Sequence, residues 1–67
     1  MTKKHYELIA ACFGHAYADA ATPAAVVALD DIRDRIAHEF HADNSRFDRE
    51  RFTDRIDSIC TRAKAAR

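Results

Sequence analysis

Apolar side chains recur at helical spacing in the first third of this chain. From residue 2 to about 20, one stripe has members three and four residues apart and is typical of an amphipathic helix with Thr2 as its N-cap. The stripe comprises Tyr6, Ile9, Ala10, Phe13 and Tyr17. Leu8 and Cys12 lie about 100 to 140° round the helix from it and form a second apolar flank. Gly14 costs roughly 1 kcal/mol relative to alanine, so it predicts a bend, fraying or the close approach of another backbone.

The pair Thr22-Pro23 predicts the start of a second helix, over 23 to about 42, with threonine as N-cap and proline at the first helical position. The charged side chains Asp30, Asp31, Asp34 and Arg35 are expected to point to solvent together with His38, and Asp31 and Arg35 form an i,i+4 pair. The expected buried face comprises Ala25, Val26, Leu29, Ile32, Ile36 and Phe40.

The third segment, residues 48 to about 64, has the clearest stripe, formed by Phe52, Ile56, Ile59 and Ala63. Asp48 is the expected N-cap, which places Phe47 and Phe52 at the spacing of a hydrophobic staple. Three cations suit the negative end of the helix dipole: Arg62, Lys64 and Arg67. The three segments together predict an all-α fold, a small three-helix bundle.

Length and composition agree with this fold. A chain of 67 residues forms one domain, residues 1–67, because it buries only about 60% of its unfolded surface. With 48% hydrophobic residues, 33% charged residues and a single Gly and Pro, the composition favours helices. The aromatic residues of the three stripes are expected in the core, namely Tyr6, Phe13, Phe40, Phe47 and Phe52.

Positive and negative charges balance at 11 each, so no overall field attracts the molecule to nucleic acid. Residues 22 to 45 carry −3 (two Arg against four Asp and one Glu), and residues 46 to 67 carry +3 (seven basic against four acidic). The second and third helices are therefore expected to pack antiparallel or steeply crossed, with partly compensating charge. Two cysteines and no leader pattern indicate a reducing cytosol, and no apolar run is long enough for a membrane span.

Histidines and cysteines form two i,i+3 pairs, Cys12 with His15 and His38 with His41. His38 is expected on the polar face, and residues 38 to 41 lack the H-E-x-x-H spacing, so we predict no metal and no cofactor. No nucleophile has a base at suitable spacing, and there is no glycine-rich phosphate loop. A single small core is also expected to leave little room for a pocket of about 300 Å³. These features predict a protein that is not an enzyme.

The second helix, the turn and the third helix resemble a helix-turn-helix, with Arg46, Arg49, Arg51 and Arg55 where base contacts are made. Acidic residues alternate with these arginines and oppose binding to phosphates, namely Asp48, Glu50, Asp54 and Asp57. The sequence thus favours a salt-bridged surface, with a DNA-binding regulator as the alternative.

The second apolar flank leaves two alternatives open. Leu8 and Cys12 either bind a partner or a second copy of the chain, or they are buried within the molecule. The first alternative is reasonable because small domains bury little apolar surface and are often stabilised by oligomerisation. Together with Arg46, Arg49, Arg51 and Arg55, Leu8 and Cys12 are the candidate partner-binding residues.

Two blocks, "KKHYELIA" at 3–10 and "ADNSRFDRERF" at 42–52, resemble short proteins encoded by bacteriophages and prophages. That group tends to show KKHYxxIA near the start and DNPRFDRxRF toward the end; here Ser45 stands in place of the proline. The resemblance implies a phage-derived accessory protein acting in the host cytoplasm. Proteins of this kind commonly bind, and in some cases inhibit, a host protein; anti-CRISPR proteins are one such class by analogy.

Overall fold

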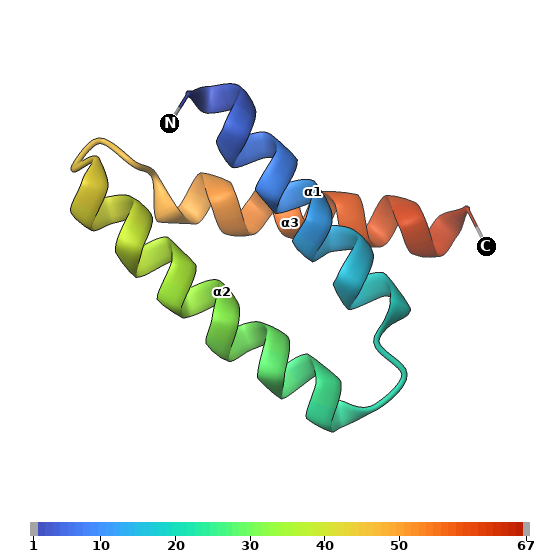
Figure 1. The fold of residues 1–67 in the computed structure, drawn as a ribbon. Helices are drawn as coiled ribbons and strands as arrows, with labels where there is room; N and C mark the ends of the chain where they lie inside the picture. The colour runs from blue at the N-terminus through green and yellow to red at the C-terminus, as the bar shows by residue number, and fades with distance from the viewer. Residues whose placement is uncertain (1, 67) are drawn as a thin grey trace.

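The computed structural model describes residues 2–66, which form three helices and no strand: α1 (Lys3–Asp19), α2 (Pro23–Asp43) and α3 (Arg49–Ala65) (Figure 1). The predicted all-α architecture is confirmed, and each helix begins and ends within about two residues of its predicted bounds. Arg67, expected at the end of the third helix, lies outside the described residues. Within residues 2–66, none of the helices combines the length and the apolar character of a membrane span.

Both internal helix starts have the predicted caps. Thr22 Oγ1 accepts a hydrogen bond from the Ala25 N–H at 3.2 Å, and Pro23 opens α2. Asp48 Oδ1 accepts from the Arg51 N–H at 3.1 Å. The rings of Phe47 and Phe52 pack with their centroids 5.5 Å apart, which confirms the staple.

α1 crosses α3 closely at Gly14, and the contact between these two helices is much more extensive than that of α2 with either (Figure 1). A Cβ added at Gly14 would lie 2.6 Å from Ile59 Cγ2 and 3.1 Å from the Ile56 carbonyl oxygen. α1 continues unbroken through this position. Of the three effects expected of Gly14, the close approach of another backbone is the one observed.

Aromatic rings from all three helices and the α2–α3 turn form the core at one end of the molecule. Phe40 lies among three of them, with ring centroids 4.8 Å from Tyr6, 5.3 Å from Phe47 and 5.7 Å from Phe52. Phe13 packs edge-on against Phe52 at 6.3 Å. The rings predicted for the core therefore lie there, and they hold the start of α1 against the start of α3.

The predicted buried face of α2 is wrong in two members. Val26 is 38% exposed and Ile32 is 48% exposed, whereas Ala37 is buried. At 100° per residue, Ala37 lies about 140° round the helix from Ile32, so the buried side of α2 is the one away from Ile32. Val26 lies near the angle of Ala37 but at the opposite end of the helix. The reason is that the fully buried positions of α2, Ala37 and Phe40, lie near its end, so only half-buried side chains such as Leu29 anchor its first half.

A chain of polar contacts along α2 links it to both neighbours. The Tyr17 hydroxyl donates to Asp30 Oδ1 at 2.6 Å, so Asp30 is half-buried rather than solvent-facing as predicted. Arg33 bridges Asp30 at 3.6 Å and Asp34 at 3.3 Å. Arg49 of α3 then lies 3.7 Å from the Asp34 carboxylate. Within residues 2–66, the expected charge compensation between α2 and α3 thus passes through Arg49. The predicted Asp31–Arg35 pair is also present at 3.1 Å.

Candidate functional site

An open groove of about 630 Å³ runs between the first turns of α1 and the beginning of α3, with the α2–α3 turn closing one end. Its lining comes from two stretches distant in sequence, residues 3 to 10 and residues 44 to 58. The sequence predicts little pocket volume within the core. This space lies instead at the surface, where two crossing helices diverge.

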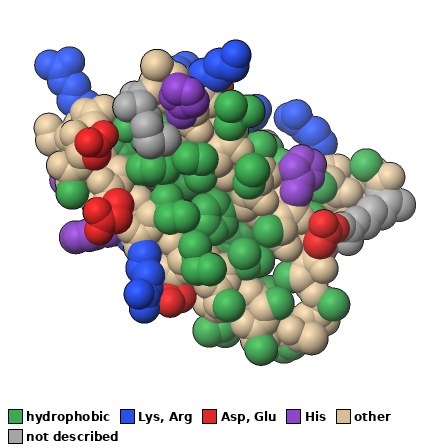
Figure 2. All heavy atoms as spheres, in the orientation of Figure 1, with side chains coloured by type: hydrophobic (Ala, Val, Ile, Leu, Met, Phe, Trp, Pro, Cys, Tyr) green, Lys and Arg blue, Asp and Glu red, His purple; other side chains and the backbone are tan. Residues whose placement is uncertain are grey.

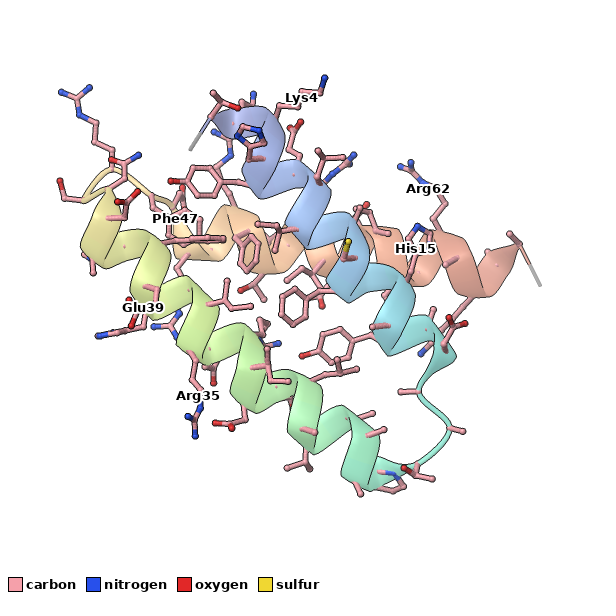
Figure 3. All side chains as sticks on the ribbon, viewed as in Figure 1. Lys4, His15, Arg35, Glu39, Phe47 and Arg62 are labelled. Atoms are coloured by element: carbon pink, nitrogen blue, oxygen red, sulfur yellow. The ribbon has the colours of Figure 1, made fainter. Side chains whose placement is uncertain are left out.

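The floor of the groove is apolar and rigid. Ala10 is 1% exposed and Phe52 is 4% exposed, while Tyr6 and Phe47 are half-buried and pack with ring centroids 5.1 Å apart. Figure 3 shows the Phe47 ring lying between α2 and the start of α3. These side chains are fixed by the aromatic core, so the floor is formed before any ligand arrives.

The walls of the groove carry mixed charge with a small basic excess. Its four cations, Lys3, Arg46, Arg51 and Arg55, face three carboxylates. All four cationic residues are exposed, and within residues 2–66 none of them forms an ion pair. The carboxylates belong to Glu7, Asp48 and Asp54, of which Asp48 is occupied in capping α3.

One polar atom of the lining is left without a partner. The Tyr6 hydroxyl is buried, yet it makes no hydrogen bond with any described residue. Burying a polar group without a hydrogen bond costs roughly 1 to 3 kcal/mol, and such groups are rare in native proteins. The Tyr6 ring packs against the core and carries this oxygen inside, below the surface of the groove.

The basic residues of α3 lie on one flank of the helix. At 100° per residue, Arg51, Arg55 and Arg62 fall within about 40° of one another, whereas Glu50 and Asp57 lie about 100° or more away. Figure 3 shows Arg62 extending outward from α3, and Figure 2 shows Lys and Arg side chains along the upper edge of this view. Asp54 lies about 60° from Arg51 and lines the groove with it. The expectation that acidic residues share the face of the arginines therefore holds for Asp54 and not for Glu50 and Asp57.

The structure divides the predicted partner-binding residues into three groups. Arg46, Arg51 and Arg55 meet at the groove. Arg49 instead faces α2, where it also donates to the Asp34 carbonyl oxygen at 3.4 Å. The two flank residues lie on α1 outside the groove lining, where Leu8 is 54% exposed and Cys12 is exposed.

Sequence reasoning missed the contribution of α1 to the groove. Tyr6 was assigned to the core, and Lys3 received no role. The signal in the sequence was weak: the hydroxyl at the end of an otherwise core-facing ring requires a partner, and Lys3 lies one turn before it. Only the crossing of α1 over α3 brings both beside the arginines.

A second hollow of about 600 Å³ lies on the other side of the α2–α3 turn and includes His38 and His41 in its lining. The pairs considered as metal ligands remain isolated there and on α1. Over the described part of the chain, no three His, Cys, Asp or Glu side chains gather as ligands of one ion would.

No protein-family model matches the chain, and neither the curated proteins nor the solved structures contain a significant match to it.

Proposed function

We propose that this protein is a phage-derived accessory protein that acts in the host cytoplasm by binding, and thereby inhibiting, a host protein, without catalysis. The observation that supports this proposal is the groove. The two sequence blocks that resemble phage proteins, residues 3–10 and 42–52, supply most of its lining. A preformed apolar floor with unpaired cations around it is typical of a surface that docks a protein segment. The resemblance to anti-CRISPR proteins is one of size and setting alone.

Affinity capture tests this proposal. The tagged wild-type chain is incubated with bacterial lysate beside a groove variant, Arg46→Ala with Arg51→Ala and Arg55→Ala. The matched control carries Arg35→Ala and Arg62→Ala, two exposed arginines outside the groove. We expect a specific host protein on the wild type and the control but not on the groove variant. Retention of no specific host protein by the wild type would count against the proposal.

A second candidate is a DNA-binding regulator, favoured by the basic flank of α3. Arg51, Arg55 and Arg62 span about 16 Å along the helix at 1.5 Å per residue, enough to follow a phosphate backbone. Gel shifts over a salt series test it, since a regulator binds at low salt and loses affinity steeply as salt rises. If the substitutions Arg51→Ala, Arg55→Ala and Arg62→Ala leave DNA retention unchanged, this candidate fails.

A further inference from the structure

We infer that the ligand of the groove is an acidic segment of a partner protein, which places a carboxylate on Arg51 and Arg55 and an apolar side chain against the floor. This inference rests on the proposed function and adds the chemical class of the ligand. It is carried by two features of one site: guanidinium groups without an ion-pair partner in residues 2–66, and an aromatic floor.

The two arginines suit a carboxylate by position. Arg51 and Arg55 are one helical turn apart, so their Cβ atoms are about 5 to 6 Å from each other on the groove side of α3. A guanidinium group binds a carboxylate through two parallel N–H donors, which gives geometric specificity as well as charge. Because neither group is committed to an ion pair within residues 2–66, a ligand does not have to displace an internal partner.

The groove fits a peptide segment better than a nucleic acid. Glu7, Asp48 and Asp54 also line it, and a continuous row of phosphates would meet all three carboxylates. A peptide presents its acidic side chains singly and can place one beside the arginines and away from these carboxylates. The floor formed by Phe47 and Phe52 adds a contact that a phosphate backbone lacks, namely burial of an aliphatic or aromatic side chain.

The probe for this inference is a short acetylated, fluorescein-labelled peptide of glutamate and leucine, with the same peptide carrying glutamine in place of glutamate as its control. Binding to the full chain is followed by fluorescence anisotropy. We expect the glutamate peptide to bind and the glutamine peptide to bind at least about tenfold more weakly. The substitution Arg51→Gln is expected to raise the dissociation constant about tenfold, whereas Arg62→Gln leaves it within about twofold.

The substitution Arg51→Gln also distinguishes binding from folding. Because Arg51 is exposed and forms no ion pair within residues 2–66, we expect the thermal midpoint of the free protein to stay the same while the affinity falls. Equal affinity for both peptides, or no response to Arg51→Gln, would overturn the inference. Tighter binding of a duplex oligonucleotide than of the peptide, with loss on Arg62→Gln, would overturn it in favour of nucleic acid.

The two proposals can fail separately. Capture of a host protein through the groove, with no binding of the glutamate peptide, would refute the acidic segment and leave the proposed function intact. Peptide binding that depends on Arg51 would support the acidic ligand class even where lysate capture fails.

Discussion

The substitution Gly14→Ala tests the packing of α1 on α3, because two effects of opposite sign compete at this position. In a solvent-exposed helix interior, replacing glycine by alanine stabilises by about 1 kcal/mol. Here the added methyl carbon would lie 2.6 Å from Ile59 Cγ2, 2.7 Å from Ile59 Cβ and 3.1 Å from the Ile56 carbonyl oxygen. Ordinary carbon contacts are about 3.5 to 4.0 Å, so the two helices would have to separate by nearly 1 Å.

The neighbours of Gly14 cannot yield cheaply. Ile59 Cβ is fixed to the backbone of α3, and the Ile56 oxygen belongs to that backbone, so a rotamer change relieves neither contact. Overpacking of this kind typically costs 1 to 3 kcal/mol. If the helices separate instead, a gap of 0.5 to 1 Å opens between other side chains of the interface, and those contacts lose about a quarter to a half of their dispersion energy. We therefore expect a net loss of roughly 1 to 2 kcal/mol, a drop of about 4 to 16 °C in the thermal midpoint.

Urea and thermal unfolding followed by circular dichroism measure this loss. The control is Ala28→Gly, at an exposed position inside α2, which isolates helix propensity and should cost about 1 kcal/mol. A double-mutant cycle with Ile59→Ala adds a second test. This substitution removes every Ile59 side-chain carbon beyond Cβ, including Cγ2, and it should cost less in the Gly14→Ala background by more than about 0.5 kcal/mol. A Gly14→Ala protein that is about 1 kcal/mol more stable than wild type would refute the close crossing.

Three further predictions concern the cap, the hydroxyl network and the apolar flank. The substitution Asp48→Ala should lower the free energy of unfolding by roughly 0.5 to 2 kcal/mol in urea titration, and no loss would mean that the third helix begins elsewhere. Burial, followed by the hydrogen bond to Asp30, raises the pKa of Tyr17 from 10.0 to about 12. The neutral phenol therefore stabilises the fold below about pH 10, and this stabilisation is lost as the pH rises to about 12. The difference in unfolding free energy between wild type and Tyr17→Phe should accordingly fall between about pH 10 and 12. An unchanged difference across that range would contradict the Tyr17 contact. The substitution Leu8→Glu should keep the unfolding free energy within about 0.5 kcal/mol of the wild-type value. Sedimentation of both proteins tests for a homodimer. A monomer mass for wild type at every concentration would exclude a dimer interface at Leu8.

The helices and their caps could be predicted because their causes are local. The hydroxyl of Thr22 and the carboxylate of Asp48 act on N–H groups three residues later, and the Phe47–Phe52 staple spans five residues. Such interactions are visible in a single sequence whatever the tertiary arrangement.

The buried face of α2 could not be predicted in the same way. Ile32 and Ala37 both lie beside the apolar stripe, and hydrophobicity alone favours burial of the isoleucine. The choice depends on the space between helices, which Ala37 fills where α2 meets the others, while Arg33 lies along the same face and bonds to the flanking carboxylates Asp30 and Asp34. Neither the local pattern nor the composition contains that information.

The exposed members of the groove are the residues whose presence folding explains least. Within residues 3–10 and 42–52, the rings of Tyr6, Phe47 and Phe52 pack in the aromatic core, so a structural requirement accounts for them. Lys3, Arg46 and Arg51 are exposed and unpaired within residues 2–66, and Arg46 and Arg51 belong to the DNPRFDRxRF pattern itself. A substitution at an exposed, unpaired arginine usually changes stability by less than about 0.5 kcal/mol. A strong effect of Arg51 on binding with no effect on folding would therefore separate the two roles of this block.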